Sequence, residues 1–175
     1  MTLAGPTVEQ VRTWWSQTNR QGYAVANESF VVVCDRQSEA EDGSISNLAG
    51  ELSDALGCAA LAVFDHDDDV LFVELFEAGQ AIDRYDSAPG YFEWDGEGDE
   101  PAPVGGDASV LTRVFGGDPA EVETVLRGEY DFAFERHRDL VTCLSLPLVA
   151  VGLGFEYLAR GDLPAGLSTH SIIEL

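Results

Sequence analysis

The chain has 175 residues, of which 32 are Asp or Glu and nine are Arg, with no Lys, so its formal net charge is −23. It lacks the clustered cations that bind phosphates, which excludes nucleic acid and anionic membranes as expected partners. Because it has no Lys, the chain carries neither a phosphate-loop lysine nor a Schiff-base lysine. Its content of 45% hydrophobic residues is enough for a folded core.

The composition also bears on cellular location. Three cysteines, Cys34, Cys58 and Cys143, lack metal-ligand spacing and have mainly apolar neighbours, which is typical of buried thiols in a reducing compartment. No secretory signal is visible, and no apolar run reaches the ~18 residues of a membrane span. We therefore expect a cytoplasmic protein without a cofactor. A high-GC genome, a salt-adapted cytoplasm and selection for a basic partner would each explain the acidity.

The first part of the chain predicts a helix, a strand and a second helix. Thr7 and Gln10 form a capping box at the start of a helix over 7–18. The β-branched run within 29–35 has apolar residues on both faces, which predicts a strand covered on two sides. The second helix begins near Ser44, a plausible N-cap.

Three strands with short connections follow, at 59–65, 70–77 and 80–85. Connections this short between apolar runs force antiparallel hairpins. The middle strand is apolar at nearly every position, so we expect it to be central and packed on both faces.

The C-terminal part is predicted to be mostly helical, because N-cap residues, apolar stripes at helical spacing and terminating glycines recur in it. The predicted helices occupy 107–116, 118–128, 131–145 and 147–160. A candidate terminal strand follows at 171–174.

This order of elements specifies an α+β fold with a largely antiparallel sheet. Its β-α-β-β-β core is packed by an N-terminal helix and a C-terminal helical region. We expect a single domain over 1–175. It comprises a sheet-containing part (1–86), an acidic Gly/Pro-rich loop (87–106), a helical part (107–161) and a tail (162–175).

The loop at 87–106, called the acidic loop below, is the main candidate for a contact surface. Loops longer than ~12–15 residues in compact domains are usually functional or disordered. Aromatic side chains anchor partners and carboxylates steer basic ones, although the same aromatic residues could instead fold back over the sheet. The partner-binding candidates are Tyr91, Phe92, Trp94, Glu97, Asp99 and Glu100.

The densest group of oxygen ligands is the polar turn at 65–69. A calcium loop that begins at its first residue would need Gly at the sixth position and Glu at the twelfth, where the chain has Val70 and Phe76. A solvated hairpin turn is the favoured interpretation. The weak metal-ligand candidates are Asp65, Asp67 and Asp69, with His66 beside them.

His137 falls on the apolar face of the helix predicted at 131–145, where a buried histidine with satisfied nitrogens is the favoured interpretation. A general-base role would require a substrate pocket beside it.

The chain shows no Gly-x-Ser-x-Gly elbow, phosphate loop or reactive-cysteine signature. Its small size, acidity and meander sheet resemble, in character only, bacterial immunity and inhibitor proteins. We expect a non-enzymatic protein-binding or regulatory module that engages a basic protein surface. Two alternatives stay open: a metal-dependent enzyme using the cluster at 65–69, and a homo-oligomeric structural protein whose sheet is partly covered by a second copy.

Overall fold

The structure is a computed structural model that describes all residues except 28, 41–43, 92–101 and 165–166. Its described strands form one antiparallel sheet in the order β7-β6-β5-β4-β1-β3-β2-β8, which confirms the predicted α+β class. The strands are β1 (Thr2–Ala4), β2 (Gly22–Ala26), β3 (Phe30–Asp35), β4 (Ala59–His66), β5 (Val70–Glu77), β6 (Gln80–Asp86), β7 (Val104–Gly105) and β8 (Ile172–Glu174).

Helices α1, α4 and α5 begin where the sequence supplies a cap. The Thr7–Gln10 capping box is present, and the side chains of Asp107 and Asp118 accept hydrogen bonds from the first turns of their helices. The helices are α1 (Val8–Trp15), α2 (Arg36–Ala40), α3 (Ser44–Leu56), α4 (Ala108–Phe115), α5 (Pro119–Arg127), α6 (Ala133–Cys143) and α7 (Phe155–Arg160), with 3₁₀ turns at Leu148–Ala150 and Thr169–Ser171. No described helix is both long and apolar enough to cross a bilayer.

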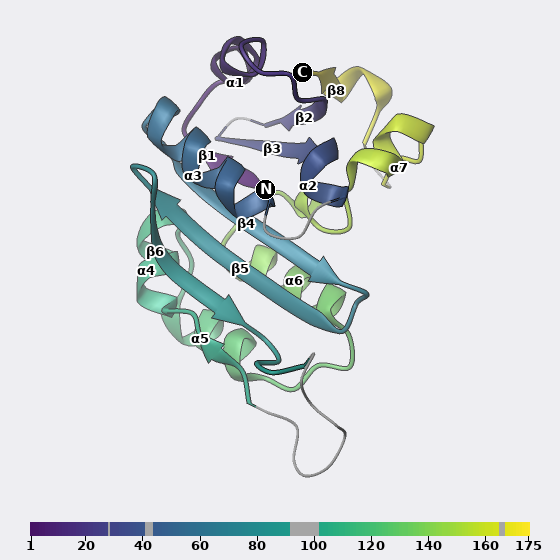
Figure 1. Cartoon of the computed structure of the whole chain (residues 1–175). Helices are drawn as coiled ribbons and strands as arrows, with labels where there is room; N and C mark the ends of the chain where they lie inside the picture. The colour runs from purple at the N-terminus through teal and green to yellow at the C-terminus, as the bar shows by residue number, and fades with distance from the viewer. Residues whose placement is uncertain (28, 41–43, 92–101, 165–166) are drawn as a thin grey trace.

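The helices cover different parts of the two sheet faces (Figure 1). Helices α4, α5 and α6 pack on one face of β4, β5 and β6, around Leu71, Val73 and Leu75. Helices α1 and α3 pack on the opposite face, mainly over β1, β3 and β4. Because the two layers are offset, no described helix lies over the outer part of β5 and β6 on the α3 side.

The prediction that the middle strand is packed on both faces is therefore only partly right. Leu71 and Leu75 are buried beneath the helices, and Phe76 is buried against α3 on the other face. On that same second face, however, Phe72 and Glu74 are only partly buried. The middle of β5 therefore has one closed face and one open face.

Strands β1 and β2 were not predicted. Strand β1 has three residues and lies between β3 and β4, where Leu3 pairs with both Val31 and Ala60. Leu3 is fully buried, so this short strand is held by its neighbours and by the core. A three-residue strand carries too little alternation to be recognised in a sequence.

The single helix predicted over 147–160 is wrong. The chain forms the 3₁₀ turn, leaves the helical conformation at Val151, and resumes as α7 after Gly154. Gly152 has a φ of +68°, which a right-handed helix does not allow. Leu148, in the 3₁₀ turn, is one of the exposed large hydrophobic residues.

Candidate partner-binding site

An open groove of about 620 Å³ lies on the face of β4, β5 and β6 that α3 leaves free. The rings of Phe64 and Phe72 lie side by side on its floor, with their centroids 6.2 Å apart. The groove is a concave and mainly apolar surface of the kind that receives side chains of a partner or a small ligand. Its other apolar lining residues are Ile45, Ala62 and Val104.

Charged side chains also line this groove, which from here on is called the sheet groove. Glu74 and Arg84 form an ion pair across β5 and β6, with 2.8 Å between Oε1 and Nε. Asp86 lies at the end of β6, directly opposite Phe72. The sheet groove thus combines an aromatic floor with carboxylates.

The acidic loop leaves the sheet beside this groove, and its first stem is fixed to β5. The backbone N–H of Leu71 donates to Ser87 Oγ at 2.8 Å, and the N–H of Ser87 donates to the Leu71 carbonyl at 3.0 Å. Further along, the Tyr91 hydroxyl donates to Asp69 Oδ2 at 2.6 Å. The described start of the loop is therefore anchored on the neighbouring strand and turn.

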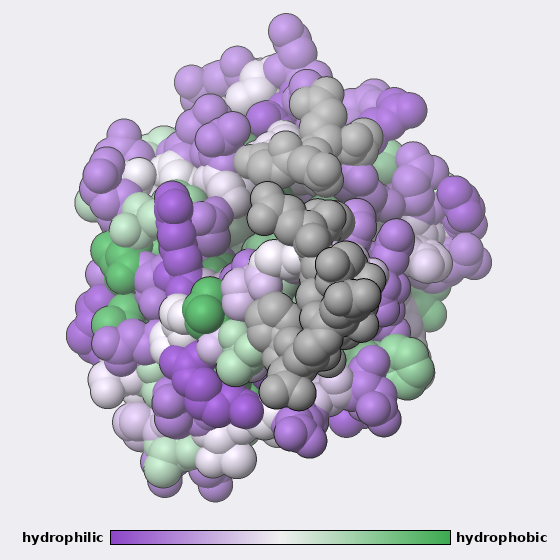
Figure 2. Space-filling model, turned by 60° about the horizontal axis from the view of Figure 1, so that its bottom comes forward, coloured by the Kyte–Doolittle hydropathy of each residue, from purple (hydrophilic) through white to green (hydrophobic). Residues whose placement is uncertain are grey.

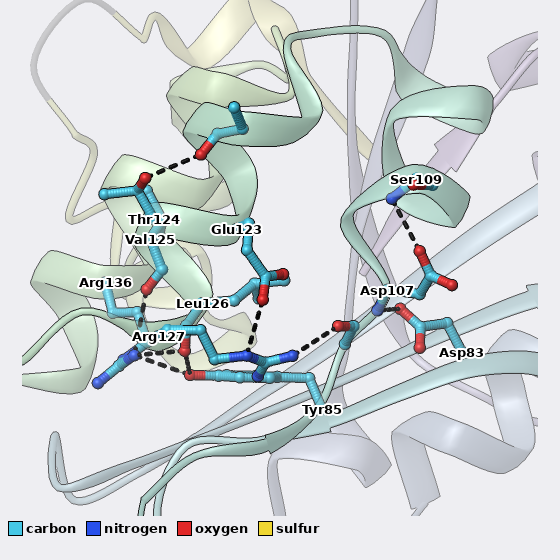
Figure 3. A network of polar contacts seen from close by, with 12 residues as sticks. Asp83, Tyr85, Asp107, Ser109, Glu123, Thr124, Val125, Leu126, Arg127 and Arg136 are labelled. Carbon is cyan, nitrogen blue, oxygen red and sulfur yellow. Dashed lines mark hydrogen bonds and ion pairs between the residues drawn. The ribbon is translucent and has the colours of Figure 1, made fainter.

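The second stem returns through β7 and is fixed to β6 and α5 (Figure 3). The N–H of Gly106 donates to the Arg84 carbonyl at 2.7 Å, and Arg127 Nη2 donates to the Gly106 carbonyl at 3.0 Å. Gly105 has a φ of +69°, and a Cβ there would lie 2.1 Å from the Arg84 carbonyl oxygen. Glycine is thus required where the loop rejoins the sheet.

Behind this stem, a buried arginine joins β6 to the end of α5 (Figure 3). Nη1 of Arg136 donates to Tyr85 Oη at 2.8 Å and to the carbonyl of Leu126 at 3.0 Å. The Tyr85 hydroxyl donates to the same carbonyl at 2.8 Å, and its burial raises the pKa of Tyr85 to about 12. The guanidinium also lies 4.7 Å from the ring centroid of Tyr130. This network satisfies C-terminal carbonyls of α5 and supports the strand below the sheet groove.

The acidic turn between β4 and β5 has a structural role that the sequence did not reveal. Asp67 and Asp68 have φ values of +52° and +65°, as in the tight hairpin turns that favour Asp, Asn and Gly. Asp68 Oδ1 accepts a hydrogen bond from the N–H of Phe134 at 2.7 Å, and the Asp68 carbonyl accepts one from Ala133. The turn therefore caps α6, in addition to connecting two strands.

The three metal-ligand candidates have separate environments. Asp65 Oδ1 accepts from the N–H of Asp68, Asp69 accepts from Tyr91, and the Asp67 side chain is exposed to solvent. Burial, added to by the neighbouring acids, raises the pKa of Asp65. Within the described parts of the chain, no three His, Cys, Asp or Glu side chains are placed to hold a metal ion. Weak metal binding by this turn stays a prediction.

Of the six partner-binding candidates, the structure describes one, Tyr91. Its hydrogen bond to Asp69 brings the acidic loop and the acidic turn into contact, which the sequence did not suggest. Phe92, Trp94, Glu97, Asp99 and Glu100 lie outside the described residues.

Sequence reasoning missed the sheet groove. Its signal was Glu74, the one charged residue in the otherwise apolar run from Val70 to Phe76. A carboxylate at that position is compatible with a strand face that is open to water and not with one that is fully covered.

His137 lines a second cavity, of about 490 Å³, at the edge where β3 and β4 end. It is buried as expected, but in the described structure neither its Nε2 nor Oδ1 of Asp35 has a hydrogen-bond partner. Burial, with a smaller effect of the N-terminal charge, lowers the pKa of His137 to about 4. Burial also raises the pKa of Cys34 to about 11, so neither group is charged at neutral pH.

Comparisons with protein-family models, with curated proteins and with solved structures found no match.

Proposed function

We propose that the protein is a protein-binding module that engages a basic protein surface through the sheet groove and the acidic loop. The observation that carries the proposal is the position of the groove beside the two ends of the loop. Asp86, the last residue of β6 before the loop, lines it, as do Val104 and Gly105 of the second stem. A partner that contacts the loop would therefore meet the open aromatic floor beside it.

The sheet groove alone is too small for a stable interface, so the proposal combines it with the acidic loop. A stable protein–protein interface buries about 800 Å² on each partner. A cavity of about 620 Å³ accommodates a few side chains and supplies only part of that area. The acidic loop, with Phe92 and Trp94 in its sequence, would supply the rest.

The charge of the chain favours a basic partner over a second copy. At a net charge of −23, two copies repel each other, whereas a cationic surface is attracted. Hydrophilic side chains dominate the face shown in Figure 2, with hydrophobic ones in separate patches. The proposal also places the protein in the cytoplasm, since Cys34, Cys58 and Cys143 are all free thiols.

The experiment is a capture from native cell extract at low and high salt, with the wild-type chain and with Phe72→Ala and Phe132→Ala. Phe72 lies on the groove floor, whereas Phe132 is an exposed aromatic residue outside it. A salt-sensitive protein retained by the wild type and by Phe132→Ala, and lost with Phe72→Ala, supports the proposal. Equal capture by all three chains contradicts it.

Light scattering on the same chains tests self-association through this face. A wild-type dimer that Phe72→Ala dissociates would place a second copy in the sheet groove and contradict the proposal. A chain that stays monomeric leaves the groove free for a different partner.

A further inference from the structure

Glu74 is an acidic residue that lies within a mainly apolar surface. Across the sheet it pairs with Ala62 of β4, and along its own strand Phe72 and Phe76 share its face. Its side chain is 21% exposed, against 73% for its ion-pair partner Arg84. The Glu74 side chain is therefore partly shielded from water, which favours a cation beside its carboxylate.

Arg84 supplies such a cation, in a weak ion pair. In the part of the chain that the structure describes, its guanidinium has one ion-pair contact, the 2.8 Å approach of Nε to Glu74. An ion pair in which one long side chain stays in solvent contributes little to stability. Because Arg84 is already largely in solvent, a cation supplied by a partner can replace it beside Glu74 without leaving the carboxylate unpaired. Glu74, in contrast, is held by the strand at a fixed place on the groove floor.

We propose that Glu74 is the anchor that receives a Lys or Arg side chain of the partner, which displaces Arg84 in the complex. This inference rests on the proposed function. The methylene groups of such a side chain pack on aromatic surface while its head reaches a carboxylate, and Phe64 and Phe72 provide that surface. Asp86, opposite Phe72, adds a second carboxylate to the groove.

Exclusion of water by the partner strengthens this contact. A charge-assisted hydrogen bond in a desolvated interface is stronger than a solvent-exposed ion pair. The exchange of Arg84 for a partner cation thus favours binding, and Arg84 competes with the partner. The two members of the ion pair consequently have opposite effects: Glu74 promotes binding and Arg84 opposes it.

The test uses two dipeptide probes, N-acetyl-Phe-Arg-amide and its neutral analogue N-acetyl-Phe-citrulline-amide, titrated into isotopically labelled protein and followed by NMR. Citrulline has nearly the shape of arginine without its charge. At about 0.15 M salt, where the Debye length is about 8 Å, the long-range attraction of the acidic chain is largely screened. We expect the arginine probe to shift the amide resonances of Phe72 and Glu74, and the citrulline probe to bind more weakly.

Three variants test the assigned roles. Glu74→Gln should abolish the preference for arginine over citrulline, whereas Arg84→Gln should tighten binding of the arginine probe by about 2–5-fold. Glu77→Gln is the matched control. Glu77 also lies on β5 and forms an ion pair with Arg113 of α4, but it does not line the groove. It should change nothing. Equal binding of the two probes, or weaker binding by Arg84→Gln, would overturn the inference.

Capture from extract separates this inference from the proposed function. If Phe72→Ala loses the partner while Glu74→Gln retains it with full affinity, the sheet groove is the binding site and the role of Glu74 is wrong. If neither variant loses the partner, both proposals fail.

Discussion

Asp68, in the turn between β4 and β5, caps helix α6 although the two are distant in the chain: its Oδ1 accepts the backbone N–H of Phe134, 66 residues later, at 2.7 Å. Helix α6 lacks a local cap, since its N-cap position is occupied by Phe132. The negative charge also lies at the positive end of the helix dipole. The turn at 65–69, which holds the weak metal-ligand candidates, thus joins strands β4 and β5 to the helical layer.

Substitutions of Asp68 test this cap. We expect Asp68→Ala to lower the free energy of unfolding by about 0.5–2 kcal/mol through loss of the cap, with a further cost because Ala is strained at a φ of +65°. Asp68→Asn keeps both the acceptor oxygen and the tolerance for positive φ, so it should be close to neutral. Urea unfolding curves of the two variants provide the measurement. Equal losses in both would contradict the capping role.

The buried His137 predicts a loss of stability in mild acid. Its pKa falls from 6.5 to about 4 on folding, so between these values the unfolded chain binds a proton that the native chain does not. Above pH 6.5 this residue therefore does not lower the free energy of unfolding. As the pH falls from 6.5 toward 4, it lowers the free energy of unfolding by about 3 kcal/mol in total.

The comparison with His137→Phe isolates this effect. The raised pKa values of Asp65 and Asp83 act in the opposite direction, because protonation of these groups favours the native state. They are present in both proteins, so the difference between the two stability profiles reports on His137. We expect urea unfolding at a series of pH values to show a shallower acid loss for His137→Phe. Parallel profiles would show that the imidazole is protonated in the native state.

The sequence was sufficient for elements whose signals are local. Short connections predicted the hairpins of β4, β5 and β6, and Thr7, Asp107 and Asp118 predicted helix starts, because a turn or a cap is determined by adjacent residues. Strand β1 was missed because its stability comes from β3 and β4, which are distant in sequence.

The candidate site could be predicted only in part. Tyr91 was recognised from its place in a long acidic segment, but its contact with Asp69 depends on how the loop stem lies against the turn. The openness of the face around Phe72 depends on where α3 sits on the sheet. The strand pattern alone does not contain that information, since an apolar strand is compatible with either arrangement.

Arg136 illustrates the same difficulty, because a charged residue on a helix is usually expected at the surface. We expect Arg136→Leu to lower the free energy of unfolding by about 1–3 kcal/mol, since it removes the buried hydrogen bonds that Arg136 donates to Tyr85 and to the carbonyls of Val125 and Leu126. Arg138→Leu, two residues further on and half exposed, is the control and should change stability by less than about 0.5 kcal/mol. Chemical unfolding of both variants makes the comparison. Similar effects of the two substitutions would contradict the role of Arg136.

The acidic loop and the sheet groove are proposed to bind a basic protein together, and the rate constants of binding to the captured partner test this claim. We expect Trp94→Ala and Phe72→Ala to speed dissociation, each by an amount on the order of 2 kcal/mol, as for aromatic anchors. Neutralising Glu97, Asp99 and Glu100 together should slow association and flatten its dependence on salt. Folded variants whose association and dissociation rate constants all equal those of the wild type would contradict the claim.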